Sequence, residues 1–219
     1  MFDLAPPLGR EQPLRLVCLG AHADDVEIGA GGTVLRLLRE RPRTHVVWVV
    51  LTGDENRQRE ARTSAEALLG DAEAVRVETP GFRDGHLPWQ GVDLKAWARE
   101  TFADAFEGER PHLVLTTGLD DRHQDHRQTA DLAWQTFRGV TIAEIEIPKW
   151  DGDAVRPNAF VRLDDATVDA KLAHLREHFA TQRGKGWYDD DTFRATLRLR
   201  GVEAGCRWAE AFTCRKLTW

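Results

Sequence analysis

An apolar run that ends in a cluster of acidic and histidine side chains is the feature that most constrains the fold of this chain. Residues 14–19, LRLVCL, are almost continuously apolar, which is typical of a strand inside a sheet. The run stops at Gly20, and four candidate metal ligands follow it: His22, Asp24, Asp25 and Glu27. Three glycines come next, and we expect Thr33 to open a helix. The segment therefore predicts a strand, an acidic loop, a glycine turn and a helix.

A second apolar run is followed by two more histidines. Residues 112–117 form this run, and His123 and His126 lie in the segment directly after it. Histidines three positions apart on a starting helical turn present their imidazoles on one side. A histidine and an aspartate three positions apart in a tight loop, His22 and Asp25, can also reach one cation. The ends of two strands thus each offer ligands to a metal ion.

Two alternative interpretations of the first segment stay open. Glycines between a first strand and a first helix are also typical of a dinucleotide-binding turn, which would need no metal. Carboxylates at the end of the strand would repel a phosphate, and this favours the metal site over anion binding. Acidic side chains in such loops also serve simply as helix caps.

The first 139 residues alternate between strands and helices. We predict strands at 44–51 and 74–77, helices at 56–70 and 93–106, and a helix that follows the second histidine cluster and runs to about residue 137. Such alternation predicts a parallel sheet with right-handed crossovers. In the common strand order 3-2-1-4-5 the first and fourth strands are neighbours, and ligands bind in the crevice at their carboxyl ends. The predicted fold is α/β, a Rossmann-like parallel β-sheet sandwiched by helices.

The pattern becomes less regular after residue 139. We predict strands at 140–147, 159–163 and 209–217 and helices at about 165–183 and 192–201. One domain over residues 1–219 is expected, with a Rossmann-like core at 1–139 and a smaller irregular C-terminal α/β portion at 140–219. We expect this second portion to determine specificity and to cap the site.

Composition narrows the range of partners. A net charge of −6 and a pI near 5.8 argue against binding to nucleic acid or to an anionic membrane surface. The three cysteines are too few and too scattered for a disulfide framework, so we expect them to be reduced. The N-terminal residues carry no leader-like pattern, and no apolar run reaches membrane-spanning length. The predicted location is the cytoplasm.

Two motifs in this chain match a known pattern. Residues 21–27, AHADDVE, are followed by Gly31, Gly32 and Thr33, and residues 123–126 read HQDH. In this the chain resembles the PIG-L/LmbE family of zinc-dependent N-acetylglucosaminide deacetylases. The sequence of the first motif is similar to that of the deacetylases of bacillithiol-type thiol biosynthesis. Ala23 and Gln124 stand where the family usually has proline, and neither position carries a ligand.

The resemblance implies a metal-dependent hydrolase that removes an N-acetyl group from an amino sugar or its conjugate. It implies that His22, Asp25 and His126 bind Zn²⁺, with Fe²⁺ as the alternative metal. Two histidines and one carboxylate leave a coordination position open for water, as in a catalytic rather than a structural zinc site. The resemblance makes Asp24 the general base and His123 the oxyanion stabiliser and acid.

Several further residues are candidates for supporting roles. Glu27 is expected outside the ligand set or as a helix-start residue, and Asp125 orients a ligand histidine or caps a helix. Arg57 matches an arginine that lines the substrate site in the family, and it could equally be a solvated helix charge. The glycine- and proline-rich segment 79–91 is expected to form a pocket wall or a surface loop. The expected substrate contacts are Arg57, Arg83, His86, Trp89 and Tyr188.

Three competing functions are compatible with the sequence. Within the same chemistry, the substrate could be a larger amide, such as a natural-product or thiol-conjugate intermediate. The remaining two are a metal-free nucleotide-binding protein and a non-catalytic sugar binder, although a binder would not need Asp24 and His123. A small amino-sugar molecule is the expected partner. The resemblance also allows a homo-oligomer, because related deacetylases are often multimeric.

Overall fold

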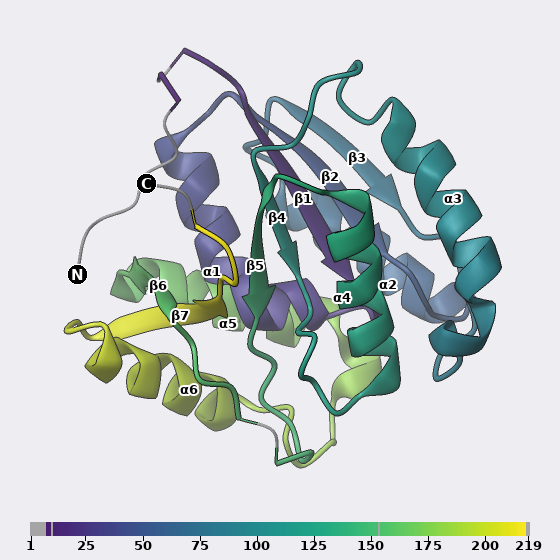
Figure 1. Cartoon of the computed structure of the whole chain (residues 1–219). Helices are drawn as coiled ribbons and strands as arrows, with labels where there is room; N and C mark the ends of the chain where they lie inside the picture. Colours follow the sequence, from purple (N-terminus) through teal and green to yellow (C-terminus); the bar gives the residue numbers. More distant parts are fainter. Residues whose placement is uncertain (1–7, 10, 153, 218–219) are drawn as a thin grey trace.

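The computed structural model of the chain describes residues 8–9, 11–152 and 154–217, and within these ranges seven strands form one sheet (Figure 1). The strands are β1 (Leu14–Gly20), β2 (Thr44–Val50), β3 (Ala74–Glu78), β4 (Leu113–Thr116), β5 (Thr141–Ile145), β6 (Ala159–Leu163) and β7 (Trp208–Thr213). The α-helices are α1 (Asp25–Glu40), α2 (Glu55–Leu68), α3 (Gly91–Ala103), α4 (Gln124–Thr136), α5 (Asp165–His178) and α6 (Asp190–Glu203), with short 3₁₀ turns η1 (Leu87–Gln90) and η2 (Ala180–Gln182). The first seven residues, which belong to the segment without a leader-like pattern, lie outside the described residues.

The sheet has the order β3-β2-β1-β4-β5-β7-β6, which confirms the predicted neighbours of the first five strands. These five strands run parallel, because each is joined to the next through at least one helix that crosses over the sheet. β7 runs antiparallel to both β5 and β6, so the sheet is mixed at one edge rather than parallel throughout. Two helices, α5 and α6, lie between β6 and its neighbour β7 in the chain, and this connection returns the chain in the opposite direction.

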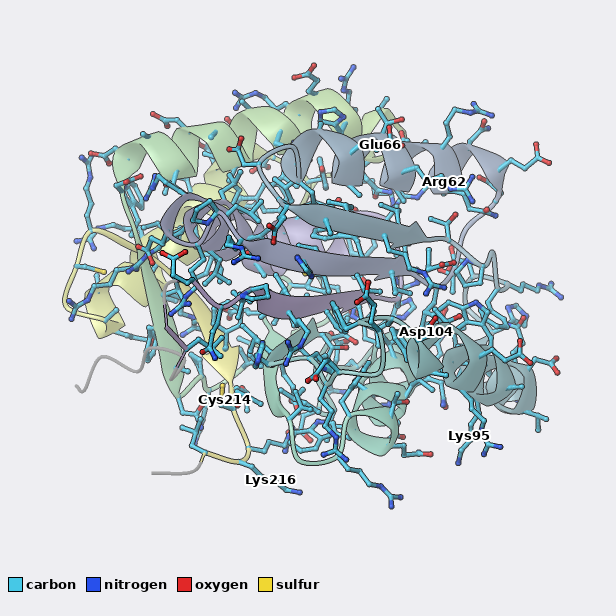
Figure 2. The ribbon with its side chains drawn as sticks, turned by 90° about the horizontal axis from the view of Figure 1, so that it is seen from above. Arg62, Glu66, Lys95, Asp104, Cys214 and Lys216 are labelled. Carbon is cyan, nitrogen blue, oxygen red and sulfur yellow. The ribbon has the colours of Figure 1, made fainter. Side chains whose placement is uncertain are left out.

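Helices cover both faces of the sheet, as predicted. One hydrophobic cluster joins alternate residues of the strands to α1, α2, α5 and α6, and a second joins the remaining strand residues to α3 and α4. Along β1, for example, Leu16 and Cys18 belong to the first cluster and Val17 and Leu19 to the second. Figure 2 shows this layering, with the helix of Arg62 and Glu66 above the sheet and the segment of Lys95 below it.

The three cysteines form no disulfide, as predicted, and Cys18 lies inside β1. Among the described residues, no helix combines the length and the apolar character needed to cross a bilayer. One predicted detail differs: the segment 79–91, expected as a pocket wall or surface loop, contains the turn η1. Asp189 caps the last helix, because its side chain accepts from the Thr192 N–H.

The predicted glycine turn after the acidic loop is wrong. α1 begins at Asp25, eight residues before Thr33, and the glycines lie inside this helix. A Cβ atom on Gly29 would lie 2.6 Å from Cβ of Ile145 in β5, so the missing side chain allows the helix to approach the sheet closely. A glycine can serve chain reversal or close packing, and here it serves packing.

Position 29 and position 31 give a matched test of this packing. We expect Gly29→Ala to lower the free energy of unfolding by about 1–3 kcal/mol, because the new methyl group overpacks against Ile145. Gly31→Ala places its methyl 3.7 Å from Cγ of Lys171, an ordinary contact, and should leave stability unchanged or raise it by up to about 1 kcal/mol. Urea denaturation measures both. Equal effects of the two substitutions would contradict the packing role of Gly29.

Candidate metal centre

The two sequence motifs meet where β1 and β4 end. These strands are hydrogen-bonded neighbours, with Leu19 opposite Thr116, so the loops that follow them leave the sheet side by side. His22 lies in the first loop, and His123 and His126 lie at the start of α4. His22 and His126 meet here although they are 104 positions apart in the chain. Their meeting point lies in the crevice in which open α/β sheets bind their ligands.

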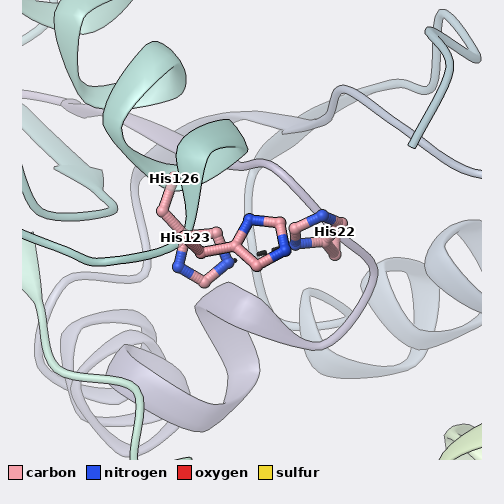
Figure 3. Close-up of side chains that lie close together, drawn as sticks. All are labelled: His22, His123 and His126. Carbon is pink, nitrogen blue, oxygen red and sulfur yellow. Dashed lines mark hydrogen bonds between the residues drawn. The ribbon is translucent and has the colours of Figure 1, made fainter. Parts of the chain in front are cut away.

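The three expected metal ligands point their donor atoms at one another. Nδ1 of His22 lies 3.1 Å from Nε2 of His126. Oδ1 of Asp25 lies 3.3 Å from the same Nε2, and Oδ2 of Asp25 lies 3.5 Å from Nδ1 of His22. Two ligands bound to one tetrahedral zinc ion would lie about 3.3 Å apart. The donor set and its spacing therefore fit a single small cation. Figure 3 shows the two ligand histidines, His22 and His126, together with His123.

Backbone groups hold Asp25 in this position. Its Oδ2 accepts the backbone N–H groups of Ala21 and His22, each at 2.9 Å, and this leaves Oδ1 turned toward His126. Burial alone would raise the pKa of Asp25, but the imidazoles of His126 and His22 hold it well below its usual value. The carboxylate is thus kept ionised, as a metal ligand must be.

A further carboxylate lies beside the outer nitrogen of each ligand histidine. Nδ1 of His126 lies 2.7 Å from Oδ2 of Asp121. Nε2 of His22 lies 3.1 Å from Asp84 and 3.5 Å from Asp125. Carboxylates in these positions fix the tautomer and the ring orientation of a ligand histidine.

Asp125 also links α4 to the segment after β3. Its two oxygens accept the backbone N–H groups of Gly85 and Leu87, at 2.6 and 3.0 Å. It does not cap α4, because the N-cap is His123, whose side chain accepts from the Asp125 N–H. Of the two uses left open for Asp125, the geometry matches the orientation of a histidine.

Asp24 lies beside the ligands in a strained conformation. Its φ of 108° is in the left-handed region, which residues other than glycine rarely adopt and which is often found at functional sites. The side chain is buried, and its Oδ1 lies 3.2 Å from Nη2 of Arg57. Burial raises the pKa of Asp24 to about 7, although Arg57 opposes the shift.

His123 also faces the donor set. Its ring lies 4.7 Å from that of His22 and 4.8 Å from that of His126, and a nitrogen of each ring lies within 4.8 Å of the other two. Burial lowers the pKa of His123, and the two neighbouring imidazoles lower it further. His123 is therefore close enough to act on whatever binds at this centre.

The centre opens into a cavity of about 780 Å³. The three expected ligands, the expected base and the expected acid all line it. Arg57 and Arg83 also line it, and Arg57 is not a solvated charge, since it bonds to Asp24, to Glu60 and to Thr181. The C-terminal portion supplies much of the remaining wall, with Lys149, Trp150, Thr181, Gln182, Lys185 and Trp187.

Three expected substrate contacts are absent from the wall of this cavity. His86 packs against Trp89, which is 75% exposed at the turn η1. Tyr188 is buried in the core and donates its hydroxyl to the Leu175 carbonyl at 3.0 Å. The loop position of Tyr188 suggests access, but its ring packs on Trp187 and Phe193. The structure therefore does not support these three contacts.

Glu27 lies in the first turn of α1, away from the ligand atoms. It is buried and accepts from the hydroxyl of Ser64, which also contacts Nε2 of His174 at 2.8 Å. Burial raises the pKa of Glu27 to about 7, although the bond from Ser64 opposes the shift. Glu27 therefore lies at the helix start, and its place outside the ligand set stays a prediction.

Two residues at the centre do not stand out in the sequence. Asp121 precedes the second motif by two positions, and nothing in that spacing separates it from an ordinary loop aspartate. Lys149 belongs to the irregular segment after β5, where no periodicity indicates which side chains turn inward. Both contact His126.

Comparisons with known proteins extend beyond these motifs. A family model described as PIG-L, GlcNAc-PI de-N-acetylase, matches residues 17–137. The diacetylchitobiose deacetylase of Thermococcus kodakarensis is 25% identical over 228 residues, which cover 90% of this chain and 81% of the relative.

Solved structures share the fold. The N,N'-diacetylchitobiose deacetylase from Pyrococcus horikoshii superposes with a TM-score of 0.68 at 23% identity, and the match covers 91% of this chain and 83% of that one. GalB, the 4-carboxy-2-hydroxymuconate hydratase from Pseudomonas putida, has a TM-score of 0.62 at 18% identity, with 95% and 98% covered. The fold alone therefore does not determine the reaction. The family model spans more than half of the sequence and includes both motifs, and the chain accordingly belongs to the PIG-L family of de-N-acetylases.

Proposed function

We propose that this protein is a metal-dependent hydrolase that removes the N-acetyl group of an N-acetylglucosamine-type amino sugar or its conjugate. The observation that carries the proposal is the convergence of His22, Asp25 and His126 at ligand spacing on the wall of a large cavity. Zn²⁺ suits this nitrogen and oxygen donor set, and Fe²⁺ is the alternative. When bound, the ion supplies a Lewis acid for the scissile carbonyl and an activated water.

The side chains around the ligands would carry the proton transfers. Asp24 lies next to the ligand Asp25 and shares the cavity wall with it, so it can accept the proton of the attacking water. Arg57 holds the Asp24 carboxylate in place. His123, whose ring lies against that of the ligand His22, can stabilise the oxyanion and donate a proton to the leaving amine. The products are acetate and a free amino sugar.

The cavity supports a substrate larger than one sugar ring, because pockets of about 300–1,000 Å³ take drug-sized ligands. Arg57, Arg83 and the aromatic pair Trp150 and Trp187 line it, and we assign substrate contacts to these residues. In this division, residues 1–139 supply the metal ligands and residues 140–219 shape specificity. A cytoplasmic location and a homo-oligomer stay predictions from the sequence.

The competing functions fit this geometry less well. The glycines that suggest a dinucleotide turn lie inside α1, and two aspartates, Asp24 and Asp25, stand at the start of this helix, where they would repel a phosphate. The relative that acts on diacetylchitobiose and the family description of a GlcNAc conjugate both favour an N-acetylated sugar over another kind of amide. A larger natural-product amide stays the second candidate, because the size of the cavity would admit it.

Metal loading tests the proposed function directly. We expect the zinc-loaded protein to release acetate from diacetylchitobiose or another N-acetylglucosamine conjugate, and we expect chelation to abolish release and Zn²⁺ or Fe²⁺ to restore it. His126→Ala should lose the tightly bound ion, since it removes one of three protein ligands. His86→Ala, which lies outside the cavity wall, should keep it. Undiminished acetate release from metal-free protein would refute the proposal.

Asp24→Asn separates catalysis from metal binding. The amide keeps the shape of the side chain but cannot take a proton, so we expect kcat to fall by about 10²–10⁴-fold. Metal content should match that of the unaltered protein, because Asp24 is not in the ligand set. Elemental analysis and acetate release measure the two quantities on one sample. A variant that keeps most of its kcat would remove Asp24 from the role of base.

Trp150 and Trp89 provide a test of the substrate wall. Both are largely exposed, at 70% and 75%, but only Trp150 lines the cavity. We expect Trp150→Ala to raise KM by about 3- to 10-fold for the best substrate, through the loss of an aromatic contact. Trp89→Ala should leave KM unchanged. A raised KM in Trp89→Ala with an unchanged KM in Trp150→Ala would mean that the substrate binds against Trp89 and not in this cavity.

A further inference from the structure

Asp121 connects the two histidines of the second motif. Its Oδ2 lies 2.7 Å from Nδ1 of His126, and its Oδ1 accepts the backbone N–H of His123 at 2.7 Å. One carboxylate therefore reaches both the expected metal ligand and the expected acid. If this carboxylate turned, His126 would lose the acceptor that keeps its proton on Nδ1 and its Nε2 free for a metal.

Lys149 holds the plane of this carboxylate. Its Nζ lies 3.0 Å from Oδ1 and 2.9 Å from Oδ2 of Asp121, so the ammonium group contacts both oxygens at once. The same Nζ lies 3.4 Å from Nδ1 of His126. Only 9% of the Lys149 side chain and 12% of the Asp121 side chain are exposed, so water competes little for these bonds.

The geometry assigns to Lys149 the role of a positioning residue: by fixing the Asp121 carboxylate, it keeps Nε2 of His126 directed at the donor set of the metal centre. This inference rests on the proposed metal site. Lys149 lies after β5 and Asp121 lies after β4, so the contact ties the C-terminal portion of the chain to a motif of the first portion. The C-terminal portion thus supports the metal centre as well as the substrate wall.

A purely structural or a substrate-binding role of Lys149 would have different consequences. A structural ion pair would affect stability but not the affinity for a metal. A substrate-binding lysine would affect KM only. Asp151 is a second partner of Lys149, at 3.6 Å, but it is more exposed and does not contact either histidine motif in the described structure. Removal of the Asp151 carboxylate should therefore change the zinc affinity much less than removal of the Asp121 carboxylate.

The test measures metal affinity without substrate. We expect Lys149→Met to raise the zinc dissociation constant about 10–100-fold in competition with a chelator, the range found when a partner of a ligand histidine is removed. Asp121→Asn should give a loss of the same size. Lys149→Arg keeps a cation that can contact both oxygens and should restore affinity to within about 3-fold of the unaltered protein. The visible spectrum of the Co²⁺-loaded protein should change in the Met variant and recover in the Arg variant.

Lys185→Met is the matched control. Lys185 lines the same cavity, but no ion pair joins it to Asp121 or to any other carboxylate among the described residues. Its zinc affinity and Co²⁺ spectrum should stay unchanged. Thermal unfolding of the metal-free proteins shows whether each variant is folded, and Asp121→Asn provides the second variant if Lys149→Met is not.

An unchanged zinc dissociation constant in Lys149→Met would overturn the inference, and so would an equal loss in Lys185→Met. These outcomes are separate from the fate of the proposed function. If the unaltered protein binds zinc tightly but releases no acetate, the role of Lys149 can still be measured. If the unaltered protein binds no metal at all, both proposals fail together, whereas acetate release with a negative result for Lys149→Met removes only this inference.

Discussion

The pairing of β1 with β4 is the constraint on which the rest of the site depends. Four consecutive residue pairs, from Leu16 and Leu113 to Leu19 and Thr116, set the register of the two strands. Because the strands are parallel, the loops that leave them start at the same edge of the sheet. A slip of this register would separate His22 from His126, which now approach to 3.1 Å, and no local feature of either loop could compensate.

A buried ion pair fixes the helix that carries Asp25. Lys171 of α5 and Glu210 of β7 lie 2.6 Å apart with almost no exposure. Glu210 accepts the backbone N–H groups of Gly32 and Thr33 in α1, and Lys171 donates to the Ile28 carbonyl. Removing two charges from water is costly, and such a pair persists where hydrogen bonds satisfy both groups. These bonds attach α1 to β7 and α5, and they set where its first turn, and hence Asp25, must lie.

Much of this arrangement can be predicted from the sequence, because it follows from local patterns. Continuous apolar runs predict the strands, strand-helix alternation predicts the order of the first five, and the topology rule brings the two motifs together. Contacts between distant segments cannot be predicted in this way. The tight contact of Gly29 with Ile145 is invisible in the sequence, so the glycines there wrongly indicate a turn. The loop position of Tyr188 does not reveal that its ring is buried. The segment around Lys149 has no periodicity, so the sequence does not reveal that this side chain turns inward.

The two adjacent aspartates of the first motif show how one short segment supports two different chemical states. Asp25 accepts two backbone N–H groups and faces two imidazoles, which hold its pKa well below the usual range. Asp24 is equally buried, Arg57 is the one cation that pairs with it in the part of the chain that the structure describes, and burial raises its pKa to about 7. The left-handed backbone at Asp24 accompanies this difference, since it places the residue just before the first turn of α1 rather than within it. When the pKa values of two neighbouring carboxyl groups are shifted in opposite directions, one group typically stays an anion and the other acts as a proton acceptor. The strain at Asp24 is thus best understood together with the role proposed for it: a regular helix start would direct residue 24 along the helix instead of toward Arg57 and the cavity.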